Sequence, residues 1–163
     1  MGEIDALADR FLTACQKREI LVATAESCTG GLIIATLTDI PGSSSMVDRG
    51  FVTYSNEAKM EMLGVSKSTL DAHGAVSEET ALEMAAGALA NSRAGVALSV
   101  TGIAGPDGGS PEKPVGLVWF GLGLSGQAPL ARKRQFENRG RQYVREQTVR
   151  AALEWGIEEL ESA

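Results

Sequence analysis

The sequence predicts an α/β fold, a three-layer α/β/α sandwich around a mostly parallel, mixed sheet of about five strands. Apolar, β-branched runs alternate with amphipathic runs over the first hundred residues, which is typical of parallel strands covered by helices on both faces. A hairpin and a long helix follow, and they predict an antiparallel member near one edge of the sheet. The length of 163 residues predicts a single domain, 1–163, that buries a core without metals or disulfides.

The first part of the chain predicts a covering helix, a buried strand and a glycine-rich corner. Residues 3–18 place apolar side chains at helical spacing, so we expect an amphipathic helix over one face of the sheet. Residues 20–25 are nearly continuously apolar, as in a strand buried on both faces. The corner at 26–31 contains two glycines, and a second helix begins after it and ends near the breaker pair Pro41-Gly42.

The middle of the chain predicts a second strand followed by short helical pieces. Polar residues 43–45 are expected to form a loop, and residues 50–54 a strand. Either Ser55 or Asn56 is expected to cap a short helix that carries Lys59 and stops at Gly64. Residues 65–76 are expected to form a loop with a short helical piece.

The last part of the chain predicts a long helix, a third strand and a second glycine-rich corner. Ser77 caps the helix, which runs through Ala90, and a buried strand follows at 95–100. The corner at 101–109 continues without any periodic signal to Pro114, and loops of this length in compact domains are often functional. The remaining elements are hairpin strands at 115–124 and 130–136 and a closing amphipathic helix at 141–160.

The composition narrows the class of function. A net charge of -6 and a pI near 4.9 argue against binding of long nucleic acids, which requires a dense positive face, whereas a small phosphorylated ligand needs only a local positive site. No apolar run approaches the roughly 18 residues of a membrane span, and the acidic start lacks the pattern of a secretion signal, so we expect no membrane partner and a cytoplasmic location. Two cysteines without CxxC spacing and a single histidine predict no metal site.

Three of the predicted parallel strands end near Ser27, Tyr54 and Thr101. Ligands of open α/β sheets bind beyond the carboxyl ends of such strands, so we expect one site built from these distant residues. Neither GxxxxGK[ST] nor GxGxxG occurs, so a phosphate would be held by main-chain N–H groups of the glycine corners. Glycines also form ordinary tight turns, and the corners alone do not distinguish the two roles.

Ser27 is a candidate nucleophile and needs a base. The only histidine, His73, falls in an expected surface turn, which leaves a lysine as the other base. An ordinary lysine is neutral in only about one of 2,500 molecules at pH 7, so its pKa would need to fall by roughly 3 units through burial or positive neighbours. Lys59 lies just past the strand that ends at Tyr54, whose hydroxyl could relay a proton or orient the lysine. Both side chains could equally lie in solvent.

Several motifs carry a resemblance to a known family. They are Glu26-Ser-Cys-Thr-Gly-Gly31, Pro41-Gly-Ser-Ser44, Tyr54-Ser-Asn-Glu-Ala-Lys59, His73-Gly-Ala-Val-Ser77, Ser99-Val-Thr-Gly-Ile-Ala-Gly-Pro-Asp-Gly-Gly109 and Lys113-Pro-Val-Gly116. In this order, and over nearly the whole chain, they resemble the CinA carboxy-terminal domain family. The resemblance is to the stand-alone form, without the amino-terminal molybdopterin-binding-like domain of longer members.

The resemblance implies a nicotinamide-nucleotide amidase. Such an enzyme hydrolyses the carboxamide of nicotinamide mononucleotide to nicotinic acid mononucleotide and ammonia, without a metal or cofactor, in pyridine nucleotide (NAD) recycling. It further implies Ser27 as the nucleophile, Lys59 as the general base and Tyr54 as an assisting residue. A homo-oligomer, with a dimer favoured, is implied by the family as well.

Further residues are candidates for binding the substrate. Main-chain N–H groups of the first corner are candidates for an oxyanion hole, which needs donors aimed at the developing negative oxygen; they belong to Thr29, Gly30 and Gly31. The resemblance suggests that the nucleotide site includes Thr101, Gly102, Gly105 and Ser43 or Ser44. Two arginines are possible phosphate contacts or ordinary surface charges, Arg141 and Arg145. Many relatives carry Gly-Asp-Arg where this chain has Arg139-Gly140-Arg141, and the sequence assigns no role to Glu26 or Cys28.

Two other functions remain compatible with these residues. A non-catalytic nucleotide-binding module of the same fold would bind nucleotide without turnover. A Ser-Lys hydrolase of another amide or ester would form a covalent adduct on Ser27 with a serine reagent but would leave the nucleotide intact.

Overall fold

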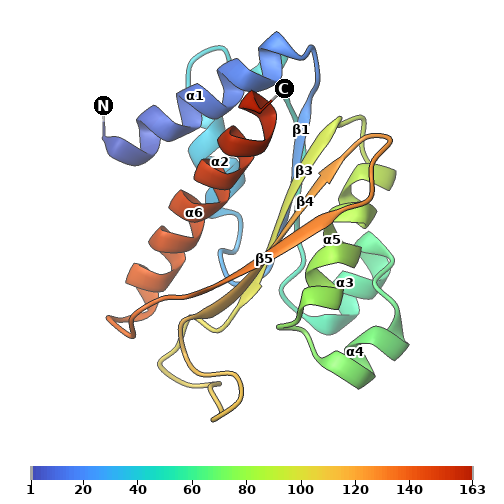
Figure 1. Cartoon of the computed structure of the whole chain (residues 1–163), viewed down its shortest axis with the longest axis vertical. Helices are drawn as coiled ribbons and strands as arrows, with labels where there is room; N and C mark the ends of the chain where they lie inside the picture. Colours follow the sequence, from blue (N-terminus) through green and yellow to red (C-terminus); the bar gives the residue numbers. More distant parts are fainter. Residues whose placement is uncertain (1, 163) are drawn as a thin grey trace.

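The computed structural model describes residues 2–162 and consists of a five-stranded mixed sheet between two layers of helices (Figure 1). In chain order the elements are α1 (Glu3–Lys17), β1 (Val22–Glu26), α2 (Leu32–Thr38), the 3₁₀ turn η1 (Ser43–Ser45), β2 (Val47–Val52), α3 (Asn56–Leu63), α4 (Lys67–His73), α5 (Glu78–Ala90), β3 (Val96–Gly102), β4 (Leu117–Leu124), β5 (Leu130–Gln135) and α6 (Arg141–Glu161).

The strand order in the sheet is β2-β1-β3-β4-β5. Strand β1 pairs in parallel with both β2 and β3, whereas β4 runs antiparallel to β3 and to β5. Four strands therefore point the same way, and β4, next to the edge strand β5, is the one that opposes them. This confirms the predicted mixed sheet with an antiparallel member near one edge.

Helices cover both faces of the sheet, as predicted. Helices α1, α2 and α6 form one layer, and α3, α4 and α5 form the other (Figure 1). Under the first layer Phe11 of α1 and Leu98 of β3 are fully buried, and Gly156 of α6 lies against both. In the second layer Met84 of α5 is fully buried in a smaller apolar cluster with Leu63. Burial of each such side chain contributes about 1.5–3 kcal/mol, which fixes the helices on the sheet.

Strand β2 differs most from its prediction. It begins three residues earlier than the expected 50–54, because its pairing with β1 runs from Val47 opposite Val22 to Val52 opposite Glu26. It is an edge strand whose residues are half-buried or exposed, so it shows neither the apolar run nor the alternation by which strands are recognised. The stretch before it, expected to be a loop, contains the 3₁₀ turn η1.

Serine residues begin three of the helices. The Ser55 hydroxyl accepts the Ala58 N–H at the start of α3, and the Ser77 hydroxyl accepts the Thr80 N–H at the start of α5, as predicted. Ser66 caps α4 in the same way. Within residues 2–162, none of the helices combines the length and apolarity needed to cross a bilayer.

The parallel strands β1, β2 and β3 end at the same edge of the sheet. Ser27 directly follows β1, Tyr54 lies two residues after β2, and Thr101 belongs to the last two residues of β3. Residues from three separate parts of the chain thus meet where open α/β sheets bind their ligands.

Candidate active site

A pocket of about 240 Å³ opens at this edge of the sheet. The expected site residues that line it are Ser27, Tyr54, Lys59, Thr101, Gly102, Gly105 and Arg141. The other lining residues are Cys28, Ala75, Val76, Ile103, Ala104, Asp107 and Gly108. The three strand ends therefore meet at one pocket.

The turn that carries Ser27 connects β1 to α2. Gly30 and Gly31 both have positive φ, 59° and 102°, a conformation that residues with a Cβ adopt at a cost. The turn folds back on itself through a hydrogen bond from the Gly30 N–H to the Ser27 carbonyl (3.1 Å). Ser27 itself is 7 % exposed, and its N–H donates to the Val100 carbonyl of β3 (3.1 Å), so the side chain is held at the pocket wall.

Lys59 extends from the first turn of α3 toward Ser27. Its Nζ lies 2.9 Å from Ser27 Oγ and donates to the main-chain carbonyl oxygens of Thr53 (2.9 Å) and Tyr54 (3.1 Å). The side chain is only 1 % exposed, and this burial lowers the pKa of the ammonium from its ordinary value to about 8. The pKa of Lys59 is thus lowered in the direction that a lysine base requires, and the main cause is desolvation.

Tyr54 contributes to the pocket mainly through its main chain. Its carbonyl oxygen accepts from Lys59, whereas its side chain is exposed and its hydroxyl bonds Arg141 Nη2 at 3.0 Å. Arg141, the first residue of α6, also donates to the Gly105 carbonyl at 2.7 Å. The guanidinium therefore bridges Tyr54 and the second glycine-rich corner across the mouth of the pocket.

The second glycine-rich corner forms one wall of the pocket. The Thr101 hydroxyl donates to the Ala75 carbonyl (2.8 Å), which joins this wall to the segment between α4 and α5. Gly105 has a φ of +86°, and a Cβ at this position would lie 2.6 Å from Val115. A side chain here would be strained and would push the corner away from the hairpin.

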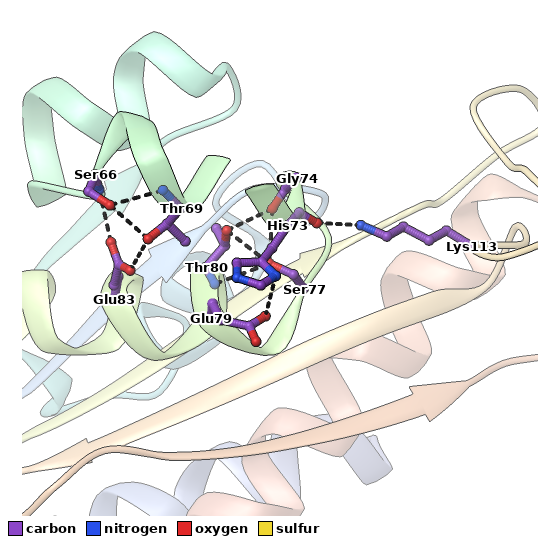
Figure 2. A network of polar contacts seen from close by, with 9 residues as sticks. All are labelled: Ser66, Thr69, His73, Gly74, Ser77, Glu79, Thr80, Glu83 and Lys113. Atoms are coloured by element: carbon purple, nitrogen blue, oxygen red, sulfur yellow. Dashed lines mark hydrogen bonds and ion pairs between the residues drawn. The ribbon is translucent and has the colours of Figure 1, made fainter. Parts of the chain in front are cut away.

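The segment between α4 and α5 forms the facing wall, and Figure 2 shows the polar contacts that hold it. The Gly74 carbonyl accepts from the hydroxyls of Ser77 (2.9 Å) and Thr80 (2.8 Å). Lys113, at the end of the long glycine-rich loop, donates to the His73 carbonyl (2.6 Å). The two walls are therefore joined at the end of the loop as well as at Thr101.

His73 and Cys28, whose roles the sequence left open, are not placed as a base or a thiolate. The His73 ring is about half exposed and pairs at 3.6 Å with Glu79, outside the pocket lining. Cys28 lines the pocket beside Ser27, but burial raises the pKa of its thiol to about 12, so the sulfur is protonated at neutral pH.

Several expected binding residues lie outside the pocket lining. Arg145 donates to the carbonyl oxygens of Cys28 (3.1 Å) and Thr29 (3.0 Å), so it braces the Ser27 turn. Ser43 is buried in η1, where its hydroxyl donates to a carbonyl at the end of α2, and Ser44 is exposed beside it. The turn residues Thr29, Gly30 and Gly31 also lie outside the pocket lining.

Some lining residues were not assigned to the site from the sequence. Ala75 and Val76 have small apolar side chains without reactive groups, although they lie inside the quoted His73–Ser77 motif. Asp107 lies in the quoted glycine-rich corner, and its carboxylate is the signal that could have marked it. These residues shape the pocket and are not part of the Ser27–Lys59 dyad, in which the Lys59 amine contacts the Ser27 hydroxyl.

Known proteins share both the sequence and the fold. The family described as CinA C-terminal domain matches residues 4–160. The nicotinamide-nucleotide amidohydrolase PncC of Escherichia coli strain K12 is 50 % identical over 153 residues, which cover 94 % of this chain and 92 % of that relative. The protein of the same name from Enterobacter agglomerans is 56 % identical over 139 residues, 85 % and 84 % of the two chains.

A solved structure agrees with these matches. The crystal structure of the competence/damage inducible protein CihA from Agrobacterium tumefaciens superposes with a TM-score of 0.95 at 52 % identity, over 99 % of this chain and 98 % of that one. The chain therefore belongs to the CinA C-terminal domain family.

Proposed function

We propose that this chain hydrolyses the carboxamide of nicotinamide mononucleotide to nicotinic acid mononucleotide and ammonia, through an acyl-enzyme on Ser27. The observation that carries the proposal is the 2.9 Å approach of the buried Lys59 amine to Ser27 Oγ at the wall of the pocket. The reaction is the one named for relatives that are 50 and 56 % identical over most of both chains. It is also the activity that the family resemblance implies.

The surroundings of Lys59 suit a general base. A neutral amine has two N–H groups and one lone pair, and the carbonyl oxygens of Thr53 and Tyr54 accept two hydrogens. The third direction from Nζ points at Ser27 Oγ, to which the ammonium donates. In the neutral amine this direction belongs to the lone pair, which can accept the hydroxyl proton once the hydroxyl turns from the Tyr54 carbonyl. Lys59 therefore removes that proton as Ser27 attacks.

The proposed reaction proceeds in two displacements. A bond forms between Ser27 Oγ and the amide carbon, and the carbonyl π electrons move onto the amide oxygen. When this intermediate collapses, the C–N bond breaks, and Lys59 returns its proton to the departing nitrogen, which leaves as ammonia. Water then attacks the ester with Lys59 again as base, which releases the carboxylic acid and restores the Ser27 hydroxyl.

Main-chain N–H groups of the Ser27 turn are the proposed oxyanion donors. The Gly30 N–H is committed to the Ser27 carbonyl, whereas those of Cys28, Thr29 and Gly31 donate to no acceptor within residues 2–162. Arg145 donates to the Cys28 carbonyl, which belongs to the same peptide group as the Thr29 N–H. Because the C=O and N–H of a trans peptide point in opposite directions, the Thr29 N–H points away from the arginine. Such fixed donors stabilise the tetrahedral intermediate without reorganisation.

Arg141 is the proposed phosphate contact. Lys59 is committed to the dyad and Arg145 to main-chain carbonyls, so Arg141 is the cation of the pocket lining left for a substrate phosphate. Its guanidinium already donates to neutral oxygens of Tyr54 and Gly105, which a dianionic phosphate would outcompete. The glycines of the second corner let the nucleotide approach the main chain closely.

Ammonia release tests the proposal. Purified protein is incubated with nicotinamide mononucleotide between pH 6 and 9, and the Ser27→Ala variant serves as the control. The expected result is release that depends on Ser27, and release no greater than that of the control at every pH would overturn the proposal. A Cys28→Ser variant should keep most of the activity, because the protonated, buried thiol has no part in the reaction.

Nucleotide binding and labelling of Ser27 separate the rival functions. A binding module would bind the nucleotide saturably without turnover, and binding would survive Lys59→Ala. A hydrolase of another amide would be labelled on Ser27 by a fluorophosphonate without acting on the nucleotide. The expected cytoplasmic location, single domain and homo-oligomeric state, with a dimer favoured, stay predictions, and light scattering of the purified protein measures the last of them.

A further inference from the structure

We propose that Glu26 is a positioning residue whose buried carboxylate fixes the turn that carries Ser27. The side chain is fully buried at the end of β1, and its two oxygens accept four hydrogen bonds. The four donors are the hydroxyls of Thr24 (2.9 Å) and Thr29 (2.7 Å) and the main-chain N–H groups of Ile33 and Ile34 (2.9 Å each).

The donors lie on both sides of the proposed nucleophile. Thr24 precedes it in β1, Thr29 follows it in the turn, and the two N–H groups belong to the first turn of α2. One carboxylate thus joins the strand, the turn and the helix. The turn needs such a joint because Gly30 and Gly31 have no side chains that could pack to hold it.

The carboxylate also replaces the usual cap of α2. The residue at the cap position is Gly31, which offers no side-chain acceptor, and Glu26 reaches the helix from five residues upstream. Burying a carboxylate is costly unless its oxygens are satisfied. Within residues 2–162 Glu26 forms no ion pair, so neutral donors alone offset that cost. Because Glu26 hydrogen-bonds neither Ser27 nor Lys59, it acts through the turn.

This inference rests on the proposed function of Ser27 as nucleophile, and three variants test it. Glu26→Gln replaces one carboxylate oxygen by an NH₂ group, which then faces N–H or O–H donors instead of accepting from them. Thr29→Val removes the hydrogen bond from the Thr29 hydroxyl to the carboxylate. Thr24→Val removes a bond to the same carboxylate, but Thr24 is already fixed by sheet pairing on both sides, opposite Gly50 and Leu98. It is therefore the matched control for lost stability.

The readouts are kcat and KM for ammonia release and, independently of that substrate, the rate of fluorophosphonate labelling of Ser27. A displacement of about 1 Å at a reacting atom lowers rates by roughly 10²-fold, so Glu26→Gln should lose on this order in both kcat and labelling, with KM changed less than about threefold. Thr29→Val should lose roughly tenfold and Thr24→Val less than about threefold. Thermal unfolding shows that each variant is folded at the assay temperature.

Two results overturn the inference. One is equal loss of kcat in Thr24→Val and Thr29→Val, which would reduce Glu26 to a stabilising residue. The other is a folded Glu26→Gln variant with wild-type kcat and labelling. If the wild type is labelled on Ser27 but releases no ammonia, the proposed substrate is wrong and the labelling rates still decide the role of Glu26. A wild type that is neither labelled nor active overturns both proposals.

Discussion

The pH dependence of the reaction should follow the titration of Lys59. With its pKa lowered to about 8 by burial, the amine is neutral in about 9 % of molecules at pH 7, against about 0.04 % for an ordinary lysine. Burial thus raises the population of the competent base roughly 200-fold. Because only the neutral amine accepts the Ser27 proton, kcat/KM should rise about eightfold from pH 6.5 to 7.5 and about fourfold more by pH 9, where it levels off.

The assay measures ammonia release at nucleotide concentrations well below KM, with an enzyme-free blank at each pH. Starting at pH 6.5 keeps the second ionisation of the substrate phosphate, near pH 6, outside most of the range. A Lys59→Arg variant is the control, because a guanidinium stays protonated at every pH used and should be inactive throughout. A flat profile, or one that still rises steeply above pH 10, would refute the assignment of Lys59 as a base with a lowered pKa.

Three further predictions concern the residues around this dyad. Lys59→Met removes the cost of the buried ammonium. Between pH 8 and 10.5 the unfolded wild type binds more protons than the folded wild type, so the free energy of unfolding of the wild type should rise with pH in this window. Relative to Lys59→Met the rise should be about 3 kcal/mol, measured by urea denaturation at each pH. Tyr54→Phe should leave the apparent pKa of kcat/KM unchanged, because the Tyr54 carbonyl rather than the hydroxyl contacts the amine; a shift above one unit would contradict this. Arg141→Gln should raise KM by roughly 30-fold, which corresponds to about 2 kcal/mol for a charged hydrogen bond. Arg139 is the control, because its guanidinium stacks on a tyrosine ring outside the pocket, and Arg139→Gln should leave KM unchanged.

The strands that could be predicted from the sequence are the ones buried on both faces. Residues 20–25 and 95–100 were recognised as apolar runs, and β1 and β3 lie there as the centre of the parallel part of the sheet. The edge strand β2 was misplaced because one of its sides faces solvent and its residues follow no apolar pattern. Burial on both faces thus leaves a clear sequence signal, and a half-exposed edge does not.

The same contrast applies to the pocket. Ser27 and Thr101 could be placed from the sequence because glycine-rich corners mark the strand ends at which they lie. Lys59 could be named as a candidate, but its burial could not be predicted, because that depends on how α3 folds back against β2 and α5. Ala75 and Val76 carry no chemical signal, and only the tertiary contact from Thr101 to the Ala75 carbonyl brings them to the pocket.

The roles of main-chain groups in the site could not be predicted from the sequence at all. Sequence analysis suggests a role for Tyr54 through its hydroxyl. The oxygens that hold the Lys59 amine are instead the carbonyls of Thr53 and Tyr54, which a residue of any type would offer at those positions. The turn at Ser27 is likewise held by main-chain groups bonded to Arg145 and Glu26. The reactive geometry therefore depends on where β2 ends and α2 begins, and side chains such as Glu26 matter because they fix those two points.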